Sequence, residues 1–323
     1  MIITVTPNPS VDRTIEVADL LRGKVHRATS TRMDPGGKGI NVSRAVHAHG
    51  GDTLAVLPIG GAHGRMMTDL LSETGTPVRP VVVAGSIRAN IAIVEPDGTT
   101  TKVNEPGPAL DDAEVADFLG TVREAVRMSP NAWVVGCGSL PGGVSGDFYA
   151  ALVRLGHENG CKVAIDTSGS PLTAAIPAGP DLIKPNRVEL GELVGADLRT
   201  VGEVVDAARE LIAGGVGELL VSLGRDGALL VTADAVTLAA ASVERPLSTV
   251  GAGDCTLAGY LLALDHPTLV TQPNGPAEAL AQAVAFGSAA VALPGTKVPS
   301  GPEVSSVRVR LDLDPDRTIP LTD

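Results

Sequence analysis

Short apolar runs alternate along most of the chain with longer stretches whose apolar residues recur at helical spacing. In 111–128, for example, Val115, Phe118, Val122 and Val126 lie three or four residues apart and predict a helix with one apolar face. The apolar runs between such stretches predict β-strands over 54–60, 132–140, 162–168, 181–186 and 217–224. This alternation predicts an α/β fold with a mostly parallel sheet and helices on both faces, and ligands gather at the carboxyl ends of such strands.

Two segments interrupt this alternation. The first, about 10–33, contains short β-like pieces without a convincing helix, and the second, about 86–105, predicts a hairpin that turns at 96–98. We expect these insertions to form one small sheet, a lid beside the ligand site, within a single domain of residues 1–323. A hairpin of this size needs a surface for its apolar face, so we expect a mobile cover or a homodimer formed through it. Residues 307–313 predict an edge strand.

Composition narrows the class of protein. The chain of 323 residues is 44% hydrophobic and 19% charged, which is typical of a globular protein with a large core. The net charge of −12 argues against a nucleic-acid partner and against binding to an anionic membrane. The three cysteines stand far apart, which argues against a disulfide scaffold or a cysteine-rich zinc site and favours the cytoplasm. The apolar stretch 279–293 is too short to span a bilayer and predicts a buried helix.

The stretch STVGAGDCTLAGYLLALD, residues 248–265, places three small residues and an acid before an apolar, helix-like run. A helix that begins here directs unpaired N–H groups and a partial positive charge out of the Gly251–Ala252–Gly253 turn, which favours an anion. Asp254 then has two interpretations. It either acts on the group bound at that turn, or it only caps the helix, and the stretch taken alone favours the cap.

Three further stretches leave alternatives open. In DPGGKGINVSRAV (34–46), glycine N–H groups and the Asn41 amide suit a bound sugar, or the stretch is a plain turn with a solvated Lys38. Asn186 and Glu189 follow a strand end and suit a hydrated magnesium ion, or they simply begin a helix with an acid in its first turn. Residues 221–231 alone predict an ordinary hairpin.

Together these motifs resemble the ribokinase-like PfkB family of carbohydrate kinases. The resemblance rests on the order Gly-Gly-Lys-Gly (36–39), Asn-x-x-Glu (186–189), Ser-Leu-Gly-x-x-Gly (222–227) and Gly-Ala-Gly-Asp (251–254), and it covers about residues 2–296. The stretches TPNPSVDRT, TKVNEPGP, GSLPGG and KPNRVEL are similar to those of the phosphosugar branch, nearest to the 1-phosphofructokinases. This resemblance implies a ribokinase-like fold and the use of ATP and Mg²⁺.

The resemblance also implies roles for individual residues. It makes Asp254 the base that takes the proton of the attacking hydroxyl, while the amides of Gly251, Ala252 and Gly253 hold the charge on the transferring phosphoryl group. It places the sugar on Asp12, Gly37, Lys38 and Asn41, and the phosphate already on the sugar on Lys24, Arg88, Lys102 and Ser139. It places the nucleotide along Asn186, Ser222, Gly224, Gly227, Ser248 and Thr249, with Ser288 near the base and Glu189 acting on magnesium through water.

The implied substrate is a ketohexose phosphate. Lys38 departs from relatives that carry glycine at this position, and its charge favours a phosphorylated sugar. Fructose 1-phosphate, phosphorylated at its 6-hydroxyl, is the first expectation, with tagatose 6-phosphate and fructose 6-phosphate as alternatives. A sugar-phosphate sensor without catalysis is the alternative from another class of protein, and the presence of Asp254 argues against it because a sensor needs no base.

Overall fold

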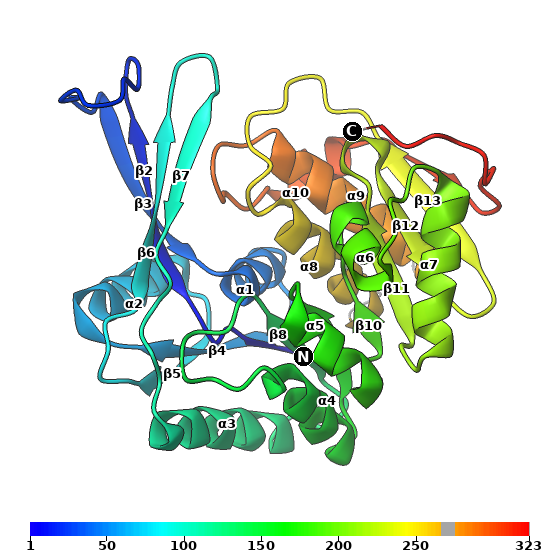
Figure 1. Cartoon of the computed structure of the whole chain (residues 1–323), viewed down its shortest axis with the longest axis horizontal. Helices are drawn as coiled ribbons and strands as arrows, with labels where there is room; N and C mark the ends of the chain where they lie inside the picture. Colours follow the sequence, from blue (N-terminus) through cyan, green and yellow to red (C-terminus); the bar gives the residue numbers. More distant parts are fainter. Residues whose placement is uncertain (266–274, 323) are drawn as a thin grey trace.

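The computed structural model describes residues 1–265 and 275–322. Its large sheet has ten strands in the order β14-β13-β12-β11-β10-β9-β8-β1-β4-β5 (Figure 1). The strands are β1 (Ile2–Val5), β4 (Thr53–Ile59), β5 (Val78–Val82), β8 (Trp133–Cys137), β9 (Lys162–Asp166), β10 (Leu182–Ile183), β11 (Glu218–Ser222), β12 (Ala228–Val231), β13 (Val236–Ala241) and β14 (Val309–Asp312). Neighbours from β5 to β11 pair in parallel, and β11 to β14 pair antiparallel, so the predicted mostly parallel sheet is confirmed.

Helices cover both faces of this sheet, as predicted. One apolar cluster packs α3 (Asp112–Arg127), α4 (Phe148–Glu158), α5 (Ser170–Ala175), α6 (Arg187–Val194) and α7 (Val201–Ala213) against one face. The other clusters pack α1 (Lys38–Ala48), α2 (Gly61–Thr74), α8 (Ala252–Asp265), α9 (Pro276–Val291) and α10 (Gly301–Ser306) against the opposite face. In β1, Ile2 contacts the second set while Ile3 and Val5 contact the first, because strand side chains alternate.

A second sheet stands apart from the large one and is called the small sheet below (Figure 1). It has the order β3-β2-β6-β7, with strands β2 (Ser10–Glu16), β3 (Ser30–Gly36), β6 (Arg88–Val94) and β7 (Thr100–Asn104). The two interrupting segments therefore do combine into one sheet, with β2 and β6 joined in parallel. The predicted edge strand is β14, and 221–231 forms the antiparallel pair β11–β12 around a short 3-10 turn.

The predicted buried helix over 279–293 corresponds to α9, which ends at Val291 and has most of its residues buried against α8 and the sheet. Among the described residues no helix is long and apolar enough to cross a bilayer. The arrangement matters for the site because β8, β9, β10 and β11 run in parallel and their carboxyl ends meet at one edge. The loops that follow these strands, the start of α8 and the base of the small sheet face that edge.

Candidate active site

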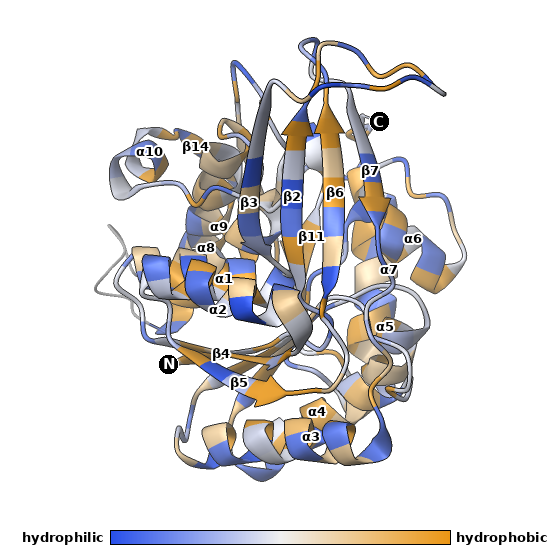
Figure 2. Cartoon of the chain, turned by 90° about the vertical axis from the view of Figure 1, so that its left-hand side faces the viewer, coloured by the Kyte–Doolittle hydropathy of each residue, from blue (hydrophilic) through white to orange (hydrophobic). Residues whose placement is uncertain are grey.

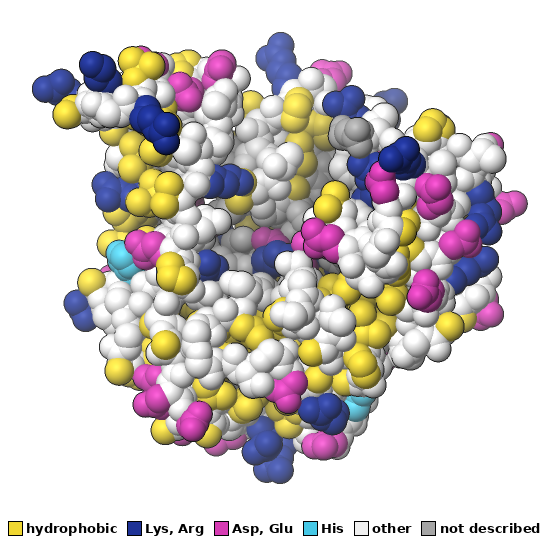
Figure 3. Space-filling view, viewed as in Figure 1, with side chains coloured by type: hydrophobic (Ala, Val, Ile, Leu, Met, Phe, Trp, Pro, Cys, Tyr) yellow, Lys and Arg dark blue, Asp and Glu magenta, His cyan; other side chains and the backbone are white. Residues whose placement is uncertain are grey.

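The molecule is hollowed between the small sheet and the body that carries the large sheet (Figure 3). Lysine, arginine and acidic side chains lie on the floor of this hollow, and the small sheet forms one of its walls. The sequence-predicted residues fall into three groups around it. Asp254 and its neighbours lie at the start of α8, the proposed sugar and phosphate ligands lie on or below the small sheet, and the proposed nucleotide ligands follow β10 and β11.

Asp254 is not a helix cap. The helix α8 begins at Ala252, so Asp254 is its third residue, and the N–H of Cys255 already donates to the Gly251 carbonyl (2.9 Å). The Asp254 carboxylate accepts a hydrogen bond of 2.8 Å from Asn41 Nδ2, while Arg44 donates to Asn41 Oδ1 (3.3 Å). Arg44 thus orients the Asn41 amide so that its N–H group faces the carboxylate. The capping interpretation is wrong, because this side chain points into a buried network.

The surroundings make Asp254 a stronger base than an exposed aspartate. Burial, and after it the nearby Asp166 charge, raise its pKa to about 6, against the Asn41 hydrogen bond and the charges of Lys184 and Lys38, which lower it. The carboxylate is therefore mostly ionised at neutral pH. It also holds a proton far better than an exposed carboxylate does, which suits a general base.

Asp166 anchors two lysines beneath the start of α8. Its side chain is fully buried at the end of β9, with Lys38 Nζ 2.7 Å from one carboxylate oxygen and Lys184 Nζ 3.2 Å from the other. Burial acts to raise the pKa of Asp166, but the Lys184 and Lys38 charges outweigh it and hold the pKa below its usual value. Asp166, and less strongly Asp254 and Glu189, raise the pKa of Lys38. Lys38 is therefore an ion-paired cation, and the alternative of a freely solvated side chain is wrong.

The Gly251–Ala252–Gly253 turn adjoins these lysines. Gly251 has φ +79°, a left-handed conformation that side chains disfavour, so glycine is required there. A Cβ on Gly253 would lie 3.2 Å from Lys184 Nζ, which places that ammonium group beside the turn. The Ala252 N–H makes a long bond of 3.4 Å to the Thr249 carbonyl. First-turn N–H groups and a buried lysine thus surround one point, an arrangement that favours an anion.

Asp12 lies on the small sheet and faces the hollow from its base. Ser10 Oγ (2.7 Å) and Asn90 Nδ2 (3.0 Å) both donate to Asp12 Oδ1, and burial raises the pKa of the carboxyl. Gly36 is paired opposite Ser10, and any Cβ at Gly36 would collide with the Asp12 carboxyl. The side-chain hydrogen bonds thus hold one carboxylate oxygen, which leaves Oδ2 as an acceptor for a sugar hydroxyl.

A cavity of about 480 Å³ lies at the foot of the small sheet, lined by Gly85, Ser86, Arg88, Glu105, Pro106, Gly107, Pro108 and Ala109. The Arg88 guanidinium donates to the backbone carbonyls of Asn8 and Glu105, both at 3.1 Å. Its Nε is buried and has no acceptor among the described residues. A cation with a spare buried donor fits a phosphate group.

The remaining proposed phosphate ligands do not all gather here. Ser139 lies in the loop after β8 and is tied to this cavity through Asn8 Nδ2, which donates to its hydroxyl at 3.2 Å. Lys24 is exposed in the loop between β2 and β3, at the far end of the small sheet from Arg88. Lys102 is exposed on β7 opposite Ala92. Within one chain, Arg88 and Ser139 come together, and Lys24 and Lys102 remain apart from them.

Four of the proposed nucleotide ligands lie at or after the carboxyl ends of β10 and β11: Asn186, Ser222, Gly224 and Gly227. Asn186 and Ser222 form a parallel bridge, and Gly224 begins the 3-10 turn that Gly227 ends. The backbone of Ser248 bonds to the Val291 carbonyl (3.2 Å), which seats the Ser248–Thr249 stretch on α9, the helix that also carries Ser288. These segments are far apart in sequence and form one side of the hollow.

Asn186 and Glu189 form a reciprocal capping box at the start of α6. Asn186 Oδ1 accepts from the Glu189 N–H (2.8 Å), and Glu189 Oε2 accepts from the Asn186 N–H (2.9 Å). The helix-start alternative is therefore confirmed, and it leaves Glu189 Oε1 outside these two bonds. A single hard carboxylate oxygen fits Mg²⁺, which keeps several waters and is also bound by substrate phosphates. The magnesium role of Glu189 stays a prediction.

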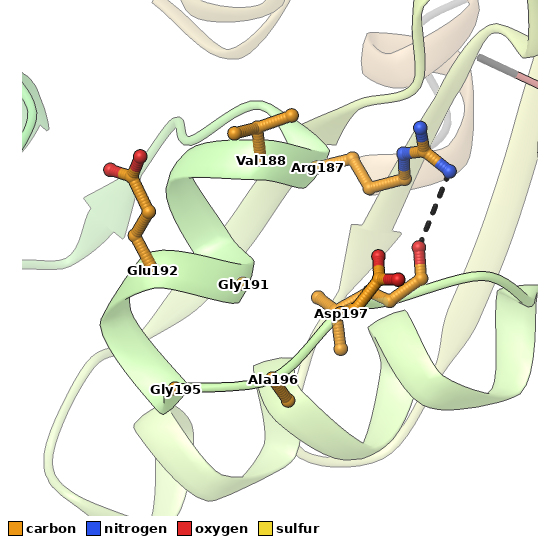
Figure 4. Close-up of a pocket in the computed structure, with 8 residues that line it drawn as sticks. Arg187, Val188, Gly191, Glu192, Gly195, Ala196 and Asp197 are labelled. Atoms are coloured by element: carbon orange, nitrogen blue, oxygen red, sulfur yellow. Dashed lines mark hydrogen bonds between the residues drawn. The ribbon is translucent and has the colours of Figure 1, made fainter.

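Another hollow, of about 360 Å³, lies beside α6 and contains none of the predicted site residues (Figure 4). Its wall is made by Arg187, Val188, Gly191, Glu192, Gly195, Ala196, Asp197 and Leu198. Arg187 donates across it to the Leu198 carbonyl at 3.3 Å. The predicted groups therefore belong to the hollow below the small sheet and not to this one.

Several residues of the site were not predicted from the sequence. Asp166, Lys184, Arg44, Asn90 and Asn8 all contact predicted residues. Asp166 carried a usable signal, because an acid directly after an apolar strand core falls at the carboxyl end of that strand. Asn90 alternates with apolar neighbours along β6, and so it could have been placed on the same face as Asp12.

Comparison with known proteins agrees with the family resemblance found in the sequence. A family model described as pfkB family carbohydrate kinase matches residues 6–302. The chain is 37% identical over 319 residues to the 1-phosphofructokinase of Haloferax volcanii, covering 98% of this chain and all of that protein. It is 38% identical to the ATP-dependent 6-phosphofructokinase isozyme 2 of Mycobacterium tuberculosis, over 82% of this chain and 78% of that one.

A solved structure has the same fold. Phosphofructokinase-2 from Escherichia coli, crystallised with substrates and products, superposes with a TM-score of 0.86 at 32% identity, over 94% of this chain and 97% of that one. The family model covers most of the chain, including the turn before Asp254, the Lys38 and Asp166 pair and the Arg88 cavity. This chain belongs to the pfkB family of carbohydrate kinases.

Proposed function

We propose that the protein transfers the γ-phosphoryl group of ATP to the 6-hydroxyl of fructose 1-phosphate, forming fructose 1,6-bisphosphate and ADP. The observation that carries this proposal is the pairing of two anion sites in one hollow. One lies at the Gly251 turn beside a buried base, Asp254, and the other lies at the Arg88 cavity. On this proposal the phosphate of the sugar occupies the Arg88 cavity, and the free hydroxyl at the other end of the sugar lies at Asp254.

The groups of the chain suggest how the transfer proceeds. Asp254 takes the proton of the sugar hydroxyl, whose oxygen forms a bond to the γ-phosphorus as the bond from that phosphorus to the ADP oxygen breaks. The first-turn N–H groups and the Lys184 ammonium stabilise charge on the phosphoryl oxygens. Lys38, held by Asp166, adds a second cation. Glu189 would hold Mg²⁺ through water, and the ion would supply further neutralisation of the phosphate charges.

The position of the phosphate on the substrate is the finer part of the proposal. Relatives named 1-phosphofructokinase and 6-phosphofructokinase match at nearly equal identity. The match to the Haloferax volcanii protein spans the whole of both chains and supports fructose 1-phosphate. Tagatose 6-phosphate and fructose 6-phosphate remain the alternatives.

The test is an ADP-release assay with fructose 1-phosphate, fructose 6-phosphate, tagatose 6-phosphate, free fructose and adenosine at equal concentrations. We expect kcat/KM to be highest for fructose 1-phosphate and far lower for the unphosphorylated compounds. A higher kcat/KM for fructose 6-phosphate would keep the kinase and overturn the choice of substrate. No ADP release with any sugar would favour the sensor.

We also propose that the small sheet is a lid and the contact surface of a homodimer. Its face opposite Asp12 carries Ile15, Ile91 and Ile93, with Met33 37% and Val103 55% exposed, and hydrophobic residues run along β6 (Figure 2). A second copy of the same sheet would cover this face. Sedimentation of the wild type and of the Val103→Lys variant tests the dimer. We expect the wild type to sediment as a dimer and the variant to shift towards the monomer.

The three free, buried cysteines support a cytoplasmic location.

A further inference from the structure

Asn8 connects three chain segments beside the Arg88 cavity, two of which contribute lining residues, Arg88 and Pro106. It lies in the loop after β1 and is 5% exposed. Its side-chain Nδ2 donates to the Pro106 carbonyl (3.0 Å) and to the Ser139 hydroxyl (3.2 Å), and its own carbonyl accepts from Arg88 (3.1 Å). The Asn8 side chain therefore touches the loop after β8 and the segment after β7, and its backbone carbonyl contacts the first residue of β6.

The orientation of the Asn8 amide follows from its partners. The Pro106 carbonyl can only accept, so the amide nitrogen must face it and the same nitrogen reaches Ser139. Asn8 Oδ1 then lies against Gly107, where any Cβ would collide with it. Position 107 therefore favours glycine for two reasons: a Cβ would collide with Asn8, and the backbone has a left-handed φ of +89°. The amide is locked, and it is a donor towards Ser139.

This orientation decides what Ser139 can offer. A hydroxyl has one donor hydrogen, and because its oxygen already accepts from Asn8, that hydrogen remains for another acceptor. Among the described residues none accepts it. Arg88 Nε is a second donor without an acceptor in the described part of the chain, and it is buried. The Asn8 side chain thus leaves Ser139 a donor, and the Asn8 carbonyl holds the guanidinium that carries the second donor. Two such donors suit an anion better than a neutral hydroxyl.

We propose that Asn8 is a positioning residue that keeps the Ser139 hydroxyl and the Arg88 guanidinium available as hydrogen-bond donors for a phosphate group. Asn8 would thereby make the protein prefer a phosphorylated sugar to a free one. The inference rests on the proposed function, which places the substrate phosphate in this cavity. Asn8 acts through Ser139 and the Arg88 guanidinium and has no part in the transfer itself. Asn8 affects the binding of the phosphosugar and does not affect the binding of ATP.

The isosteric change Asn8→Asp tests this directly. An aspartate accepts from the Ser139 hydroxyl, which turns a lone pair of Ser139 towards the substrate phosphate and adds a negative charge beside it. We expect KM for fructose 1-phosphate to rise by about 100-fold, the scale of a lost charge-assisted hydrogen bond with added repulsion. KM for ATP should stay within about twofold, and kcat/KM for free fructose should fall by less than about threefold. Unchanged preference for the phosphorylated sugar would overturn the proposal.

A double-mutant cycle keeps the proposal testable if Asn8→Asp folds poorly. Asn8→Ala and Ser139→Ala should each raise KM for the phosphosugar by roughly tenfold, and the double variant should exceed either single variant by no more than about threefold. If the increase in KM of the double variant equalled the product of the two single increases, Asn8 would not act through Ser139. Asn159→Asp is the matched control, because its amide also donates to a backbone carbonyl (Leu155, 2.8 Å), at the end of α4.

Arg88→Ala in the same assay separates the two ideas. A raised KM for phosphosugar in Arg88→Ala with normal values in Asn8→Asp would reject the role of Asn8 and keep the phosphate cavity. Normal values in both variants would reject the cavity itself, and with it the position proposed for the substrate phosphate.

Discussion

The Asp254 end and the Arg88 end of the hollow differ in what supports them. Asp254 lies on α8, which is packed between α1 and α9, and its partner Asp166 ends a strand of the large sheet with a fully buried side chain. Arg88 begins β6, whose residues are all half-buried, next to β7, whose residues are all exposed. The groups assigned to the transfer are held by a dense core, whereas Asp12 and Arg88, two of the groups assigned to sugar recognition, lie on a thin four-stranded sheet.

This difference has a physical reason. Stabilising charge on a transferring phosphoryl group requires donors that are already in place, because moving them during the reaction costs free energy. Binding a sugar phosphate requires an open path and then exclusion of water, which a movable sheet provides. We therefore expect changes in the core to act on kcat and changes at the small sheet to act on KM.

The largest expected effect belongs to Asp254→Asn. The change keeps the shape and removes the proton acceptor, so kcat should fall by roughly 10²- to 10⁴-fold, the scale of a lost general base. The Kd for sugar phosphate, measured by calorimetry on the same preparation, should be unchanged or slightly lower, because a negative charge beside two anions is gone. A folded variant with near-normal kcat would show that Asp254 is only structural.

Arg88→Ala is the corresponding change at the other end. Loss of the guanidinium should raise KM for the phosphosugar by about 10- to 100-fold, with little change in KM for ATP. Steady-state kinetics with each substrate varied in turn measure both values. If kcat fell instead and KM stayed constant, the division of roles between core and small sheet would be wrong.

The pH dependence of kcat tests the role of Asp254 in the core. The base must be ionised, and burial raises the pKa of Asp254 from 3.8 to about 6, so kcat should fall as pH decreases through about 6. Below this value the loss should approach about tenfold per pH unit. The measurement uses saturating fructose 1-phosphate, since the substrate phosphate also titrates near pH 6. A flat profile down to pH 4.5 would contradict the assignment of the base.

Hydrogen exchange compares the mobility of the two regions and carries the smallest expected effect. Amides of residues 86–105 should exchange quickly in the free protein and at least about tenfold more slowly with bound sugar phosphate, because closure buries and orders the strands. Amides of β8 and β9 should be protected in both states, since these strands are central and fully paired. Equal protection of 86–105 with and without ligand would remove the lid from the proposal.

Local pattern was enough to predict most of the fold. The helix over 111–128 and the strand over 162–168 were readable because their periodicity is set by residues close in sequence, and structure places α3 and β9 there. The capping box of Asn186 and Glu189 was equally local, although the sequence was interpreted without naming it. The capping interpretation, which the isolated stretch favoured for Asp254, was wrong because its actual partner, Asn41, lies 213 positions away.

By itself the sequence determined the alternation of strands and helices, the two β insertions, and the motifs that make the chain a carbohydrate kinase. Only the tertiary structure decided which charges meet. Lys38 pairs with Asp166 across 128 positions, and Asn8 reaches Ser139 across 131. These contacts depend on which strand ends lie side by side in the sheet, and on the burial that raises the pKa of Asp254. Neither strand order nor burial is a property of neighbouring residues, so no local pattern records them.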